Sequence, residues 1–219
     1  MRDFTPKYSR GRDTEEGVLG RLRKDYEREF PGETYEKHET YPMETLYEIT
    51  KDFQPDNTGK PFPKYLCDQV SYNLGLDETR QVKIYTSVGY HLDWRGVDTF
   101  IEVNIGNGEI IRCPIDLKTD PNQITPEEGV RIEPFNKGRK QDRVIFYYPS
   151  DGISYKRESQ KFFVVVDKVA KAIEKVLRRQ SVIMGVTIRP ITEYELDESN
   201  KIIEVRHNEL IRRWKKRTT

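Results

Sequence analysis

The sequence is poor in the residues that build zinc sites. Its two cysteines, Cys67 and Cys113, are far apart, so that no C-x-x-C pair exists. Neither a cysteine-based zinc site nor a disulfide framework is expected, and so few cysteines are typical of a protein from a reducing compartment. The three histidines are scattered and form no H-E-x-x-H motif. A zinc site of either common kind is therefore not expected.

Long apolar runs are also missing. No stretch approaches the roughly 20 residues that span a bilayer, and the charged start MRDFTPKYSRGRD lacks the apolar centre of a signal peptide. We therefore expect a soluble cytoplasmic protein without a membrane partner.

Phosphate-binding and nucleophile motifs are absent as well. The sequence contains no G-x-x-x-x-G-K-[ST] loop, no G-x-G-x-x-G after a strand and no G-x-S-x-G elbow. A nucleotide cofactor, ATP-driven motor activity and esterase-type serine catalysis are therefore not indicated.

Charge of one sign is not in excess. Lys and Arg number 38 against 37 Asp and Glu, a net charge of +1. Binding of nucleic acid through bulk charge is excluded, whereas a local basic patch is not. The 219 residues include 13 Tyr, 9 Phe and 2 Trp, enough for a real core in one domain with an appended arm.

Hydrophobic periodicity predicts an α/β chain. After a loose basic arm over 1–13, helices are expected at 14–30, 44–53, 63–74, 168–179 and 204–217. Strands are expected at 82–88, 98–105, 110–117, 143–148, 162–166 and 182–188. The run FFVVV at 162–166 is interpreted as a buried strand. The alternative is a single helix over 159–180, which three successive valines disfavour.

One hairpin brings chemically useful side chains together. Asp98 opens a strand, Gly106-Asn107-Gly108 forms a turn, and Asp116 and Lys118 lie near the end of the returning strand. Because Asp116 and Lys118 are two residues apart, they share a face. The hairpin should place Asp98 close to both.

Such a group suits phosphodiester hydrolysis. Asp98, Asp116 and the carbonyl of Leu117 can hold a hard divalent cation such as Mg²⁺, which polarises a phosphodiester and activates a bound water. Lys118 can orient or deprotonate that water, or stabilise the charge that develops on the phosphate.

Gly96-Val97-Asp98 and Ile115-Asp116-Leu117-Lys118 resemble the signature of the PD-(D/E)XK nuclease superfamily, in which an acidic residue opens one strand and D/E-x-K lies on the next. Asp93, a few residues upstream, is similar to an acid found in small phage-type members. The resemblance covers roughly residues 62–180, and it departs from the pattern where Val97 replaces a proline.

The resemblance implies a restriction-endonuclease-like core, a central mixed β-sheet flanked by helices, with an N-terminal helical extension. The expected division is an arm and helical extension over 1–60, the core over 61–190 and a helix with a basic tail over 191–219. It further implies a nuclease that cuts DNA with Mg²⁺, or Mn²⁺ in its place, and a homodimer as one option.

Superfamily members often add an acid from the helix that precedes the first strand. Asp68 is the candidate here, and Glu48 is a weaker one. Glu102 shares a strand face with Asp98 and could be a further ligand, although an exposed position is favoured. His91 could bind a phosphate, but an exposed loop histidine is the favoured interpretation.

Basic residues offer a surface for nucleic acid. Lys137, Arg139, Lys140 and Arg143 cluster around a glycine after the candidate catalytic strand, where they could bind phosphates. A solvated face is the equal alternative, and the same choice applies to the basic residues within 156–161 and to the tail over 212–217.

Three rival hypotheses stay open. The chain could be a DNA-binding or assembly subunit with a vestigial site, or a nuclease directed at RNA. It could also be an unrelated α+β protein whose D-x-K is accidental, in which case Asp98 and Asp116 would not lie near each other.

Overall fold

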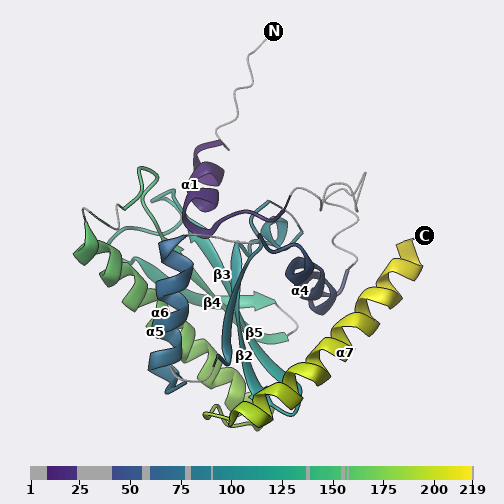
Figure 1. Ribbon diagram of the computed structural model, residues 1–219. Helices are drawn as coiled ribbons and strands as arrows, with labels where there is room; N and C mark the ends of the chain where they lie inside the picture. The colour runs from purple at the N-terminus through teal and green to yellow at the C-terminus, as the bar shows by residue number, and fades with distance from the viewer. Residues whose placement is uncertain are drawn as a thin grey trace.

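A five-stranded sheet lies between two layers of helices (Figure 1). The computed structural model describes residues 9–23, 41–55, 60–76, 80–89, 91–136, 139–153, 156 and 158–218. The helices are α1 (Ser9–Leu19), α4 (Met43–Asp52), α5 (Pro61–Leu74), α6 (Ser159–Met184) and α7 (Glu193–Thr218), with a short 3-10 helix η1 (Asp93–Arg95). The strands are β1 (Val82–Thr86), β2 (Thr99–Gly106), β3 (Glu109–Lys118), β4 (Val130–Asn136) and β5 (Arg139–Tyr147).

The sheet is mixed, with the strand order β1-β2-β3-β5-β4. β1, β2 and β3 form an antiparallel meander. β5 then pairs parallel to β3, and β4 closes the edge as the antiparallel partner of β5. The chain is therefore α/β, with a mixed sheet flanked by helices as expected. The sequence interpretation missed β4 and placed its hairpin with β5 in a basic loop.

The turn between β2 and β3 confirms the predicted hairpin. Gly106 pairs with Glu109, so only Asn107 and Gly108 lie between the strands. Both have positive φ, 55° and 72°, which matches the tight primed turns that follow strand twist. A Cβ on Gly108 would lie 2.3 Å from the Ile202 side chain of α7, so this glycine also lets α7 approach.

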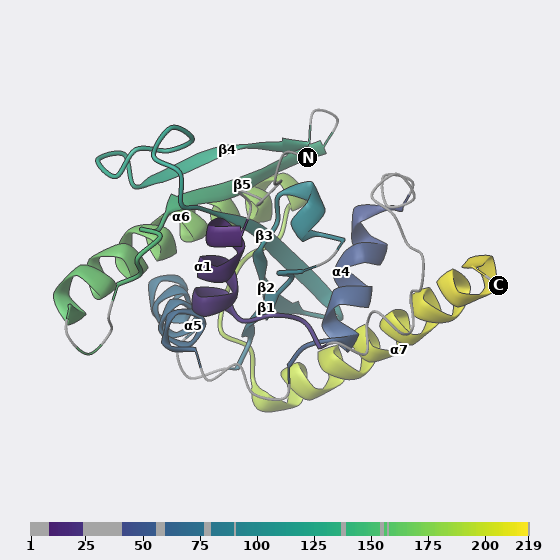
Figure 2. The ribbon, with the colours of Figure 1, turned by 90° about the horizontal axis from the view of Figure 1, so that it is seen from above.

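The main core lies between the sheet and the pair α5 and α6, which Figure 2 shows on one side of the sheet. Inward residues of β2 and β3, such as Ile101, Val103, Cys113 and Ile115, pack against α5 and α6. Leu19 of α1 joins the same core. α1 itself lies across one end of the sheet in both views (Figures 1 and 2).

The opposite face is covered by α4 and α7 (Figure 2). Tyr47 of α4 packs on Phe100 of β2, with ring centroids 4.7 Å apart. Side chains alternate along a strand, so Asp98 and Glu102 share this face with Phe100.

The run at 162–166 is helical, and the predicted strand there is wrong. Phe162, Val166 and Val169 are buried along one side of α6, while Phe163 and Val164 are 42% and 49% exposed. This is the helical period, and it extends the apolar stripe of the later part of α6. The single-helix alternative is therefore correct. Burial of the apolar stripe against the rest of the fold outweighs the slightly unfavourable helix propensity of valine.

Two other predicted boundaries change. The strand expected at 182–188 is instead the end of α6, which stops at Gly185 with φ 68°, followed by non-strand chain. α1 begins at Ser9 and ends before Gly20, whose φ is 85°, so the helix expected over 14–30 stops early. The rest of that prediction, over 24–30, lies outside the described residues.

The remaining helices agree with the expected pattern. α4 and α5 match the predicted helices within two residues, and Gly75 ends α5 with φ 72°. α7 is longer than expected at both its ends. Within the described residues, no helix combines the length and apolar character needed to cross a bilayer.

Candidate active site

The pairing of β2 with β3 places Asp98 beside Asp116. The backbone N–H of Asp98 donates to the carbonyl of Ile115 at 2.9 Å, and Thr99 lies opposite Ile115. The Asp98 carboxylate accepts a hydrogen bond from the N–H of Leu117 at 2.7 Å. Both aspartates are buried, at 3% and 1% exposure. The separation of these aspartates that an accidental D-x-K would have allowed is therefore not observed.

Two cations from neighbouring strands contact Asp116. Lys118 Nζ lies 2.5 Å from one carboxylate oxygen, and an Arg143 nitrogen lies 3.2 Å from the other. The Lys118 side chain is 29% exposed, so its ammonium remains accessible from solvent. Asp116 and Lys118 therefore share a face, as their spacing predicts.

Arg143 is engaged within the site and is not a free surface cation. Its guanidinium lies 2.6 Å from Glu133 and donates to the carbonyl of Gly96 at 3.0 Å. A Cβ on Gly96 would lie 2.6 Å from this guanidinium, and Gly96 has φ 73°. The glycine of the G-V-D motif thus makes room for the arginine that holds Asp116.

The other predicted DNA contacts cannot be placed. Lys137 and the side chains of Arg139 and Lys140 lie outside the described residues. Their nucleic-acid role stays a prediction.

Asp93 and Glu15 complete an acidic group around Asp98. Asp93, at the start of η1, accepts the N–H of Gly89 at 2.8 Å. Carboxylate oxygens of Glu15, Asp93 and Asp98 all lie within 4.8 Å of one another. We call Glu15, Asp93, Asp98, Asp116 and Lys118 the Asp98 cluster.

Burial and crowding raise the pKa values of these acids. Burial raises the pKa of Asp98 well above its ordinary value, and the Asp116 and Glu15 charges raise it further. Burial, followed by Asp93, raises the pKa of Glu15 to about 7. Burial also raises the pKa of Asp93. Burial is the largest cause for all three acids, neighbouring carboxylates add to it, and Arg12 acts to lower the pKa values of Glu15 and Asp93.

Burial acts on the pKa of Lys118 in the opposite sense from its action on the acids. Burial disfavours the Lys118 ammonium, but the Asp116 carboxylate outweighs burial, and the net pKa of Lys118 is raised. Among the described residues, only Lys118 and Arg143 form ion pairs with the acids of the Asp98 cluster. An added divalent cation would balance the remaining negative charge.

Glu102 and Glu48 belong to a different group on the same face. We call Glu44, Glu48, Lys51, Glu102 and Arg112 the Arg112 cluster. Arg112 donates to Glu102 at 2.6 Å and also to Glu44 and Glu48. The expected exposed position of Glu102 is wrong, since it is 5% exposed and its charge is matched by Arg112.

Helix α7 adds a histidine to this group. His207 nitrogens lie 2.7 Å from Glu48 and 2.7 Å from Asp52. Burial acts to raise the pKa of Glu48, but His207, Arg112 and Lys51 together lower it to about 2. Hydrogen bonds to Asp52 and Glu48 raise the pKa of His207 to about 9.

The positions of Asp68 and His91 decide two further expectations. Asp68 is exposed on α5 and does not join the acids of the Asp98 cluster. His91 is 2% exposed, with its ring 6.0 Å from that of Trp94. The favoured exposed loop histidine is therefore wrong.

Glu15 is the site residue that sequence reasoning missed. Thr14, Glu15 and Glu16 predicted a helix start, but nothing local indicates that this helix crosses the sheet end 83 residues before Asp98. The expectation of an acid from a preceding helix pointed to Asp68, whereas the helix that brings a carboxylate close to Asp98 is α1, with Glu15. Only the tertiary packing of α1 shows this.

Comparisons with protein-family models, with curated proteins and with solved structures gave no match. The function must therefore be argued from the site itself.

Proposed function

We propose that this chain hydrolyses DNA phosphodiester bonds in a reaction that depends on a divalent cation. The observation that carries the proposal is the convergence of Asp98, Asp116 and Lys118, with Glu15 and Asp93 beside them. A protein gains no stability by crowding two buried and two half-buried carboxylates together, when ion pairs within the described part of the chain reach only one of them. Such an arrangement is expected where a cation belongs to the working state.

The donor set fits Mg²⁺. All candidate ligands are oxygens, which this hard cation prefers. Asp98 and Asp116 would hold it, with the Leu117 carbonyl as predicted from sequence and with Glu15 and Asp93 as additional carboxylates. When bound, Mg²⁺ polarises the phosphodiester and lowers the pKa of a water, and Mn²⁺ could substitute.

The protein side chains supply position and charge. A raised pKa keeps Lys118 protonated near neutral pH, so its ammonium acts as a cation that stabilises negative charge developing on the phosphate. Arg143 holds Asp116 from the other side and fixes its orientation. The residues proposed for hydrolysis thus lie on or directly beside three neighbouring strands: Asp98 directly before β2, Asp116 and Lys118 on β3, and Arg143 on β5.

The arrangement of elements supports the resemblance to the PD-(D/E)XK superfamily. Along the chain α5, the meander β1 to β3, β5 and α6 follow the predicted order of helix, three strands, strand and helix. β4 is an addition at the sheet edge. We propose a restriction-endonuclease-like core on this basis.

The test is cleavage of supercoiled plasmid and of linear duplex, each with Mg²⁺, Mn²⁺ or EDTA. Wild type should nick or cut only with the metal ion, and Lys118→Ala should not. Lys201→Ala is the matched control. It also removes a lysine that is paired with a carboxylate, that of Glu198, but at an exposed position on α7 outside the Asp98 cluster. Wild type that is inert on DNA but cuts RNA would transfer the proposal to RNA. Wild type that retards DNA without cutting any substrate would identify a binding subunit.

A further inference from the structure

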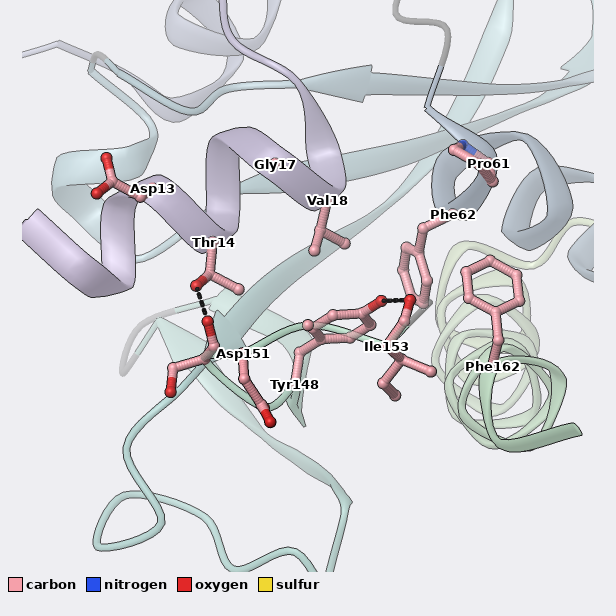
Figure 3. A pocket seen from close by; sticks show the side chains of 12 residues that line it. Asp13, Thr14, Gly17, Val18, Pro61, Phe62, Tyr148, Asp151, Ile153 and Phe162 are labelled. Atoms are coloured by element: carbon pink, nitrogen blue, oxygen red, sulfur yellow. Dashed lines mark hydrogen bonds between the residues drawn. The ribbon is translucent and has the colours of Figure 1, made fainter. Parts of the chain in front are cut away.

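A hollow borders α1, the helix that also carries Glu15 of the Asp98 cluster. It has a volume of about 580 Å³ and is open to solvent, within the range of small-ligand sites. α1 and the start of α5 form one wall, and the chain from Tyr148 to Ile153 and the start of α6 form the other (Figure 3). Thr14 donates to the carbonyl of Ser150 at 3.2 Å, which ties the two walls together.

The hollow and the active site share their supporting elements. Tyr148, which lines the hollow, donates its N–H to the carbonyl of Lys118 at 2.9 Å. α1 presents Thr14 and Gly17 to the hollow and Glu15 to the acidic group. A helix with side chains is about 10 Å across, so that a ligand could occupy both places at once.

The lining selects the kind of group that fits. Phe62, Tyr148 and Phe162, each 3% exposed or less, line the hollow with the small exposed parts of otherwise buried rings, and the exposed Asp13 and Asp151 contribute carboxylates. Among the described residues that line the hollow, none is lysine, arginine or histidine. A phosphate would be repelled there, whereas a flat group with an apolar body and N–H donors would be accepted. Adenine, cytosine and guanine each carry an exocyclic amino group with two N–H donors, whereas thymine carries no amino group and offers a single ring N–H.

We propose that this hollow binds one unpaired, amino-bearing nucleobase of the DNA strand whose backbone lies at the Asp98 cluster. The proposal rests on the proposed function. Stacked bases rise only about 3.4 Å per step, so a base inside an intact duplex could not enter the hollow. The substrate would therefore carry an extruded or unpaired base near the cleaved bond, as enzymes that take a base out of the stack require.

Gly17 provides a direct test. It lines the hollow, and a Cβ built on it meets nothing within 4 Å. Gly17→Phe should fill the hollow without disturbing the fold, whereas Gly17→Ala adds one methyl group and is the matched control. Both changes favour the helix relative to glycine, and the thermal midpoint of each variant would verify folding.

The substrates are end-labelled duplexes that are fully paired or carry one bulged adenine, cytosine or thymine, each incubated with Mg²⁺. Wild type and Gly17→Ala should cut near a bulged adenine or cytosine about 10-fold faster than the paired duplex, and faster than near a bulged thymine. Gly17→Phe should bring the ratio of bulged to paired cleavage close to one. Cleavage without any preference for a bulge, or a preference unchanged in Gly17→Phe, would overturn the proposal.

Binding separates this proposal from the nuclease proposal. If wild type cuts none of the duplexes, the nuclease proposal fails, and fluorescence anisotropy of the same duplexes in EDTA decides the base site. Tighter binding of the adenine bulge that Gly17→Phe abolishes would support a base site in a non-cleaving protein. Equal binding of all duplexes would reject it.

Discussion

Two acidic groups lie along one face of the same sheet, with Phe100 between Asp98 and Glu102. In the Arg112 cluster, three glutamates meet Arg112 and Lys51, with His207 beside them. In the Asp98 cluster, four carboxylates lie close together, and among the described residues the ion pairs join Lys118 and Arg143 to Asp116 alone. The pKa of Glu48 is lowered to about 2, whereas that of Glu15 is raised to about 7.

The difference shows that burial of carboxylates is not by itself a sign of function. Burial acts to raise the pKa in both groups, and the number and placement of cations decide the net direction. The Arg112 cluster, whose carboxylates are matched by cations, links α4, β2, β3 and α7 and has a structural role. An under-neutralised group is a place where a cation, a proton or a substrate can be taken up.

Removing the central cation should disturb the neutralised group most. Arg112→Met would leave Glu44, Glu48 and Glu102 without their shared partner, and we expect a loss of about 3–5 kcal/mol in the free energy of unfolding. Urea denaturation would measure it. Adding Glu48→Gln and Glu102→Gln to that variant should recover part of the loss. A cost below about 1 kcal/mol would contradict the assignment of this group as structural.

Removing the cation of the other group should change activity and not stability. We expect Lys118→Ala to slow Mg²⁺-dependent cleavage by about 100- to 1,000-fold, the scale seen when a charge-stabilising donor is lost. Arg143 still contacts Asp116, so the thermal midpoint should move by less than about 3 °C. Single-turnover cleavage and calorimetry would measure the two effects. A large loss of stability with unchanged cleavage would reverse the comparison.

Cation binding should stabilise only the under-neutralised group. Saturating Mg²⁺ should raise the thermal midpoint by about 3–6 °C at pH 8, and Asp98→Asn should abolish the rise, whereas Glu102→Gln should not. Calorimetry with and without EDTA would measure it. An equal rise in Asp98→Asn would place the cation elsewhere.

The same group predicts a pH dependence. The folded chain holds a proton on Glu15 up to about pH 7, whereas an unfolded glutamate loses it near 4.5. Since the folded state binds more protons in this window, Glu15 should make metal-free stability fall as pH rises from about 4.5 to about 7. Urea titrations in EDTA should show a shallower fall for Glu15→Gln. An identical pH profile in that variant would contradict the crowding argument.

The smallest effect concerns the histidine on α7. His207 has a pKa of about 9 when folded and an ordinary value of 6.5, so its contribution is full below about pH 6.5 and is lost as pH rises to about 9. His207→Gln should cost about 1 kcal/mol at pH 6 and less at pH 9. Urea titrations at both pH values would show it. A cost that grows with pH would refute the ion pairing with Glu48 and Asp52.

The hairpin that carries Asp98, Asp116 and Lys118 could be predicted because every step is local. The turn residues specify two-residue closure, and strand alternation then fixes which side chains share a face. Periodicity likewise identified α4 and α5.

Long-range packing was not readable in this way. The valine-rich start of α6 suits strand or helix, and only its burial on α5 and the sheet decides between them. The contribution of Glu15, the burial of Glu102 and the pairing of Arg143 each depend on elements that are distant in sequence. The hairpin register alone places Arg112 opposite Glu102, but the charged partners that come from α1, α4, β5 and α7 are not visible in the sequence.

The position of His207 also bears on how the chain reaches this state during synthesis. It lies 159 residues from Glu48 and 155 from Asp52, so α4 and the sheet leave the ribosome well before α7 exists. Closing so long a loop is entropically costly and is favoured only once its two ends are formed. We therefore expect α7 to dock last, onto a surface already assembled around Arg112. A nascent chain that pauses before residue 193 would already hold every residue of the Asp98 cluster while Glu48 still lacks its partner on α7, so docking of α7 is expected to follow the assembly of that cluster.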